Sequence, residues 1–293
     1  MFRRNCGNGA VLFRTYGFST AGAARVLKFV GIDLAWGEKK HSGVAVIDAQ
    51  GIVIGASAHV RTDDEICQFV GLGQGGGAVI AVDAPLIVRN RDKCRPVEKR
   101  LTEMFWPYDA GPYPANLDNP AFQEGGRIPR FVNVLEGKGF VQRIHAAKQE
   151  EQQTLIEVFP SPAQVVLFPG QNRRQHIHCT GLRYKPKQGR SWAEVHSQWE
   201  IYRARLRSLE YGNPPLKLSP EVKKQIGIDI TEYEGTRYKQ FDDLLDGIFC
   251  AYLAYYFWYW GSDRSWTLGD LEHGCVLLPR CHLPDCPLAD SLT

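Results

Sequence analysis

The sequence predicts an α/β fold whose sheet begins with three consecutive strands. Three strand-like segments follow one another before any helical pattern appears, and the two most apolar runs each end on an acidic residue. A dinucleotide-binding fold would alternate strand and helix from its first strand, so this order argues against that class. The apolar fraction of 44% and the charged fraction of 23% are ordinary for a globular protein with a substantial core.

The expected strands are short segments rich in valine, isoleucine and other apolar residues. They cover residues 26–33, 41–48, 51–60, 78–83 and 154–159. Turn residues from Asp48 to Gly51 join the second and third segments, which predicts an antiparallel hairpin. The fourth segment is apolar at all but its last position, as expected for a central strand covered on both faces.

Three helices are expected, at residues 62–72, 192–209 and 241–260, with a further short strand near residues 275–278. Thr62 and Glu65 form a capping-box pattern at the start of the first helix. Residues 107–129 are rich in Pro, Gly, Asn and Asp, which predicts a long packed loop. Residues 169–235 are polar and basic, and we interpret them as an insertion or lid before the last helix.

We expect one domain over residues 25–280, a basic extension at residues 1–24 and a tail at residues 281–293. The extension contains arginines and no acid, as organelle transit peptides do; the alternative is a segment that takes no part in the fold. No run of about 18 apolar residues is present, so a membrane-spanning helix is not expected. The expected location is the cytoplasm, or an organelle if the extension is a genuine transit peptide.

The 8 cysteines are scattered along the chain, which favours a reduced protein over a disulfide framework. Cys275, Cys281, His282 and Cys286 are of types that bind zinc, but they lack the closely spaced cysteine pair of structural zinc sites. A loose C-terminal tail is therefore the preferred interpretation. The formal net charge of +3 is too small to indicate nucleic-acid binding by itself.

Three acids end or lie within expected strands: Asp33, Asp83 and Glu157. An ionised carboxylate in a buried strand is costly unless it is paired or bound to a metal. A single acid at a strand end often caps the helix that follows, but three in one domain are harder to explain in this way. These side chains are therefore candidates for a functional site.

The last expected helix begins with Asp242, Asp243 and Asp246, of which the second and third share a face because residues i and i+3 are neighbours. Acids in a first turn complement the helix dipole, which accounts for Asp242. Asp246 lies among apolar residues and is expected to be buried. Converging carboxylates repel one another, and a hard divalent cation such as Mg²⁺ or Mn²⁺ relieves that repulsion.

The motifs that surround these acids occur in a fixed order: GIDLAWG followed by GVAVID, then AVDAPL, EVFPSPA and DDLLDGIFCAYLAY. Together they resemble the domain of unknown function 429 family, over roughly residues 26–279. Members of that family are predicted to be nucleases of the RNase H-like superfamily. The resemblance implies an RNase H-like mixed sheet of three antiparallel and then two parallel strands, flanked by helices, the last of which carries the final acid.

The resemblance also implies roles for individual residues. Acids of the family pattern stand at Asp33, Asp83, Glu157 and Asp246, which makes these four the catalytic candidates. The closing segment is similar to the end of RuvC-type resolvases, and by that analogy Asp33, Asp83 and Asp246 are metal ligands with Asp243 as a fourth. Glu157 could instead anchor its strand.

Basic residues near these acids are candidates for substrate binding. Arg89 and Arg95 lie in a basic segment directly after Asp83, and Lys185 lies in the basic insertion. Both segments could hold phosphate groups. For the insertion, a solvated loop is the equally favoured alternative.

The leading hypothesis is a metal-dependent phosphodiesterase that acts on nucleic acid, with a metal-bound water as the nucleophile. The second hypothesis is a non-catalytic module that binds nucleic acid or protein and retains the fold. The third is a relative of actin-like kinases and ATPases, which would require a duplicated domain and a second glycine-rich phosphate motif. The sequence contains neither. It does not indicate the oligomeric state.

Overall fold

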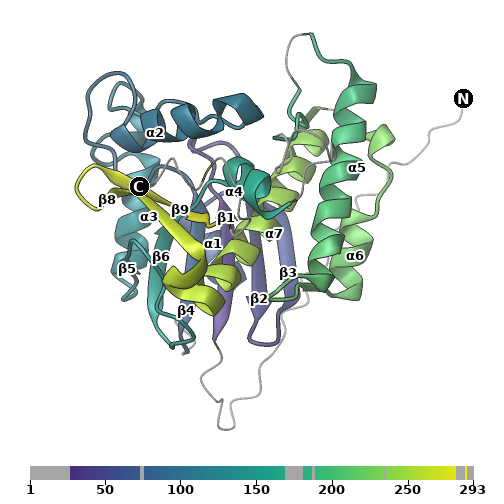
Figure 1. The fold of residues 1–293 in the computed structure, drawn as a ribbon, viewed down its shortest axis with the longest axis horizontal. Helices are drawn as coiled ribbons and strands as arrows, with labels where there is room; N and C mark the ends of the chain where they lie inside the picture. The colour runs from purple at the N-terminus through teal and green to yellow at the C-terminus, as the bar shows by residue number, and fades with distance from the viewer. Residues whose placement is uncertain are drawn as a thin grey trace, which may run out of the picture.

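The protein folds around a mixed seven-stranded sheet with helices on both faces (Figure 1). The fold is seen in a computed structural model, which describes residues 27–72, 76–168, 181–186, 189–233, 235–281 and 288. The expected extension at residues 1–24 and all of the expected tail except residues 281 and 288 lie outside this part of the chain.

Five strands form the centre of the sheet, as predicted: β1 (Lys28–Asp33), β2 (Ser42–Asp48), β3 (Ile52–Val60), β4 (Ala78–Asp83) and β6 (Gln153–Glu157). The pairs β1–β2 and β2–β3 are antiparallel, whereas the pairs β1–β4 and β4–β6 are parallel. The expected number of five is nevertheless wrong. Two short edge strands, β5 (Val141–Gln142) and β7 (Lys217–Leu218), extend the order to β5-β6-β4-β1-β2-β3-β7.

The three predicted helices are present with shifted ends. Helix α1 (Asp63–Val70) has the predicted capping box and ends at Gly71, which is left-handed, rather than at Leu72. Helix α5 spans Trp192–Ser208. Helix α7 spans Gly235–Trp260 and thus begins well before residue 241. Its three aspartates therefore lie inside the helix, and the explanation of Asp242 by a first-turn dipole is wrong.

The remaining elements were not predicted, apart from β9. The α-helices are α2 (Pro96–Phe105), α3 (Arg127–Glu136), α4 (Pro160–Leu167) and α6 (Pro220–Ile226). The 3₁₀ helices are η1 (Trp106–Tyr108), η2 (Pro120–Phe122), η3 (Leu209–Tyr211), η4 (Ile230–Glu232) and η5 (Gly261–Arg264). Strands β8 (Ser265–Asp270) and β9 (Gly274–Pro279) form a separate antiparallel hairpin, and β9 covers the short strand expected near residues 275–278.

Two hydrophobic cores lie on opposite faces of the sheet. Alternate residues of β1, such as Phe29 and Val30, belong to different cores because successive side chains of a strand point to opposite faces. The core that contains Phe29 includes most of α7, and the other includes the apolar faces of α1 and α3. In Figure 1, α5 and α6 lie beside the β3 edge of the sheet, so the region expected to be an insertion also supplies the edge strand β7.

Helix α7 lies unusually close to β1 and β2, and glycines make this possible. A Cβ atom added at Gly31 would collide with the backbone of Ala251, and one at Gly43 would collide with the carbonyl of Asp243. A Cβ atom at Gly247 would lie 2.8 Å from the carbonyl carbon of Gly43. A side chain at position 247 would therefore have no room, and the contact brings the acids of α7 to the ends of the central strands.

Candidate carboxylate site

Two of the predicted acids lie side by side at the ends of neighbouring strands. Asp33 ends β1 and Asp83 ends β4, and the two residues are register partners in this parallel pair. Neighbouring strands are about 4.8 Å apart, and partners in register point to the same side of the sheet. Both side chains are partly exposed and line a cavity of about 250 Å³.

Helix α7 brings three further carboxylates to this end of the sheet. Asp242, Asp243 and Asp246 are each buried, with exposed fractions of 2%, 4% and 1%. Asp243 packs against Gly43, which is itself the register partner of Asp33 on the antiparallel side of β1. We call Asp33, Asp83, Asp242, Asp243 and Asp246 the carboxylate cluster.

Asp83, Asp243 and Asp246 hold their protons more tightly than carboxylates in water. Burial, followed by the charge of Asp33, raises the pKa of Asp83 well above its usual range. The same two causes raise the pKa of Asp243 to about 9, although Lys239 opposes them. Burial raises the pKa of Asp246 to about 7, against the opposing charge of Lys185. The cluster is therefore short of positive charge.

Two buried tyrosines orient Asp246. The hydroxyl of Tyr202 in α5 donates to Oδ1 of Asp246 at 2.7 Å, and the hydroxyl of Tyr184 lies 2.9 Å and 3.0 Å from its two oxygens. Both rings are almost fully enclosed. The part of the chain between β6 and α7, which contains both tyrosines, thus lies against the site and fixes the side chain of Asp246.

Two lysines supply the positive charge nearest to the cluster. Nζ of Lys239 donates to Oδ2 of Asp242 at 3.0 Å and also to Oδ1 of Asp243. Nζ of Lys185 lies 3.6 Å from Oδ2 of Asp246. Burial alone would lower the pKa of Lys185, but the nearby aspartates outweigh it and raise that pKa well above its usual value. Both lysines are therefore charged at neutral pH.

Glu157, the third acid predicted on a strand, is held by a buried arginine instead. Arg95 donates from both terminal nitrogens to Glu157, at 2.6 Å and 3.1 Å, and from Nε to Glu98 at 2.9 Å. The backbone N–H of Leu86 also donates to Glu157 at 2.8 Å. Both partners of this ion pair are 2% exposed. The contacts favour a structural role for Glu157, and both Glu157 and Arg95 line the cavity that Asp33 and Asp83 line.

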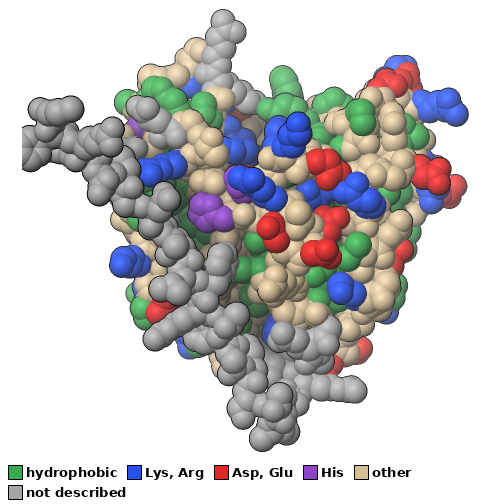
Figure 2. Space-filling view, turned by 180° about the vertical axis from the view of Figure 1, so that it is seen from behind, with side chains coloured by type: hydrophobic (Ala, Val, Ile, Leu, Met, Phe, Trp, Pro, Cys, Tyr) green, Lys and Arg blue, Asp and Glu red, His purple; other side chains and the backbone are tan. Residues whose placement is uncertain are grey.

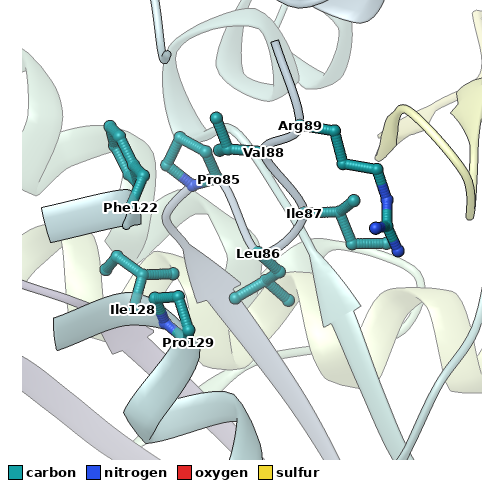
Figure 3. Close-up of a pocket in the computed structure, with 8 residues that line it drawn as sticks. All are labelled: Pro85, Leu86, Ile87, Val88, Arg89, Phe122, Ile128 and Pro129. Atoms are coloured by element: carbon teal, nitrogen blue, oxygen red, sulfur yellow. The ribbon is translucent and has the colours of Figure 1, made fainter. Parts of the chain in front are cut away.

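Arg89, the other arginine predicted to bind substrate, does not line the cavity of the carboxylate cluster. Its Nε donates to the carbonyl of Glu272 at 2.9 Å. It lines a second cavity of about 210 Å³, which lies between the loop after β4 and the residues around η2 and α3. In Figure 3, Arg89 lies across this loop from Phe122 and Ile128. None of the predicted acids lines this second cavity.

The donor chemistry of the cluster suits a hard divalent cation. All its donors are carboxylate oxygens, which Mg²⁺ and Mn²⁺ prefer, and Oδ2 of Asp33 and Oδ1 of Asp242 are buried with no hydrogen-bond partner among the described residues. The side-chain arrangement differs from this expectation. In the described part of the chain, no three His, Cys, Asp or Glu side chains are grouped so that they could hold a metal ion.

Sequence reasoning missed the partners of the acids. Lys239 precedes Asp242 and Asp243 by three and four residues, a helical spacing that would have indicated the ion pair if the start of α7 had been placed at Gly235. Tyr184 and Tyr202 carried no comparable signal, because they lie far from Asp246 in the sequence. Of the four Cys and His residues near the C-terminus that were considered for zinc binding, His282 and Cys286 lie outside the described residues.

On the face drawn in Figure 2, basic and acidic side chains lie among one another, so the described residues of this face form no continuous basic surface for a polyanion. None of the described helices, including α7 with its 26 residues, combines the length and apolar character needed to cross a membrane.

Comparison with known proteins identifies the family. Searches of curated proteins and of solved structures each found no match. The family model described as "Protein of unknown function (DUF429)" matches residues 31–267, which include every acid of the carboxylate cluster and most of the chain. This chain therefore belongs to the DUF429 family.

Proposed function

We propose that this chain is a divalent-metal-dependent hydrolase of phosphodiester bonds, built on an RNase H-like sheet, with nucleic acid as its substrate class. The observation that carries the proposal is the pairing of Asp33 with Asp83 at adjacent strand ends, beside the buried acids of α7. A bound Mg²⁺ or Mn²⁺ ion would neutralise these acids and lower the pKa of a bound water.

The residues of the site would divide the work according to their positions. Asp33 and Asp83 line the cavity and are the ligands that an entering ion would meet first. Asp246, which is held by two tyrosine hydroxyls, and Asp243 would supply further carboxylate oxygens from α7. Lys185 and Arg190 line the same cavity and would attract a phosphate group.

A non-catalytic binding module is the second candidate, and one observation favours it. The lysine pairs already compensate part of the charge of the cluster, as they would in a polar core that serves only structure. The two candidates differ in their affinity for divalent ions. In a purely structural cluster, an added ion would gain little, because it would have to displace existing ion pairs.

Calorimetric titration with Mn²⁺ separates the two candidates. We expect the wild-type chain to bind Mn²⁺ and Asp83→Asn to bind it at least about tenfold more weakly, because one charged oxygen ligand is lost. Glu136→Gln is the matched control, since Glu136 is an exposed acid at the end of α3 and lies outside the cluster. Labelled single-stranded and duplex DNA and RNA then test for Mn²⁺-dependent cleavage.

Cleavage by the wild type and by Glu136→Gln, but not by Asp83→Asn, would support the hydrolase. If the wild-type chain bound neither Mn²⁺ nor Mg²⁺ and cleaved none of these substrates, the proposal would be wrong. The binding module would then be the better account of the carboxylate cluster.

A further inference from the structure

The carboxylate cluster contrasts with the ion pair of Arg95 in how its cations are held. The guanidinium of Arg95 is enclosed, and it donates to two carboxylates and to the carbonyl of Ile87. Lys239 and Lys185 have side chains that are 58% and 43% exposed. Both side chains are therefore partly open to water, and their stems are long and flexible.

We propose that Lys185 and Lys239 are exchangeable counter-ions, which hold the carboxylate cluster together in the ion-free protein and withdraw when a divalent cation binds. This inference rests on the proposed function, because it concerns how the same site is loaded. It also explains why the cluster has the donor chemistry of a metal site without the arrangement of one.

The two lysines approach the cluster from different elements. Lys239 lies on α7 itself, one turn before the acids that it pairs with. Lys185 follows Tyr184, whose ring stays buried and whose hydroxyl holds Asp246. Withdrawal of both ammonium groups would therefore leave the backbone and Asp246 in place. Rotation of the two lysine side chains would be enough to expose the acids to an ion.

The alternative is that the lysines are permanent partners of the acids, which keep the carboxylates in position. The alternatives predict opposite effects of removing a lysine. If an ammonium group competes with the divalent ion, its removal strengthens ion binding, because like charges near one site repel. If it is needed to keep the acids in position, its removal weakens ion binding or leaves it unchanged.

The test is Mn²⁺ titration of the full chain carrying Lys239→Met, with Lys185→Met as a second variant in case the first does not fold. Methionine keeps the length of the stem and removes the charge. Lys224→Met is the matched control, because Lys224 is an exposed lysine in the last turn of α6. We expect Lys239→Met and Lys185→Met to bind Mn²⁺ at least about tenfold more tightly than the wild type, and Lys224→Met to bind as the wild type does.

Thermal unfolding gives a readout that does not depend on catalysis. In EDTA, Lys239→Met should unfold at a lower temperature than the wild type, because its acids lose a counter-ion. Saturating Mn²⁺ should remove this difference in unfolding temperature. Unchanged or weaker Mn²⁺ binding by both lysine variants would overturn the exchange alone. Absence of Mn²⁺ binding in the wild type and in every variant would overturn the proposed function and, with it, the exchange.

Discussion

Arg95 is almost fully enclosed, and all its observed partners are protein groups. It bridges Glu98 and Glu157, and the second oxygen of Glu98 accepts from the backbone N–H groups of Arg95 and Ala115. The network therefore joins the start of α2, the end of β6 and the loop before η2. Loss of the guanidinium would leave both glutamates buried with backbone N–H donors but no cation.

Arg95→Met should destabilise the protein by about 3–5 kcal/mol, because it leaves two buried carboxylates without their cation. The measurement is the free energy of unfolding in urea at neutral pH. Arg100→Met is the matched control, since Arg100 pairs with Glu103 on the exposed side of the same helix at 3.4 Å. An exposed pair contributes about 0–1 kcal/mol. Equal losses in both variants would show that the buried network has no special role.

At the scale of elements, the contact between α7 and the sheet determines where the cluster forms. Gly31 lies in β1, and a Cβ atom added there would clash with the backbone of Ala251 in α7. Gly55 lies in β3, where an added Cβ atom would be 3.5 Å from the ring of Phe69, an ordinary contact distance. The two positions have the same residue type in the same sheet and differ in the space available.

Gly31→Ala should therefore lower the free energy of unfolding by more than the roughly 1–3 kcal/mol typical of overpacked cores, because two backbones would have to separate. Gly55→Ala should change it by less than about 1 kcal/mol. Chemical denaturation of both variants gives the comparison. A small loss at Gly31 would mean that α7 can move away from β1 without cost, which would contradict the close packing.

The central strands were predictable because each is an apolar run bounded by turn residues. The edge strands β5 and β7 have two residues each, too few for any pattern, and they exist only because a longer strand lies beside them. Helix α3 has apolar residues at helical spacing, but its Pro129 and the glycines before it favoured a loop. The early start of α7 was hidden because its first turns are polar.

The carboxylate cluster was predictable for the same reason as the strands. Acids at the ends of apolar segments stand out, and parallel strands bring their ends together. The contacts that Lys185 and Tyr184 make with Asp246 were not predictable, since both residues come from a polar segment with no periodic pattern. The enclosure of Arg95 in an ion pair was equally hidden. It depends on a partner 62 residues away in the sequence, which only the tertiary fold brings into contact.

At the scale of the whole molecule, the cluster links stability to pH. The pKa of Asp246 rises from an ordinary value of 3.8 to about 7, and that of Asp243 rises to about 9. Between pH 4 and these values the folded protein keeps protons that the unfolded chain has released. The free energy of unfolding therefore falls as pH rises through this range, by up to about 1.4 kcal/mol per pH unit for each group.

In EDTA, we expect the free energy of unfolding to fall between pH 5 and pH 7, and the fall to be smaller in Asp246→Asn, which cannot titrate there. Glu136→Gln should retain the slope of the wild type. His41 has a lowered pKa and gives an opposing slope near pH 6, so the difference between Asp246→Asn and the wild type is the decisive quantity. Saturating Mn²⁺ should reverse the trend, because ion binding requires deprotonated carboxylates and strengthens as pH rises. Identical slopes for Asp246→Asn and the wild type would show that Asp246 is not the group that holds the proton.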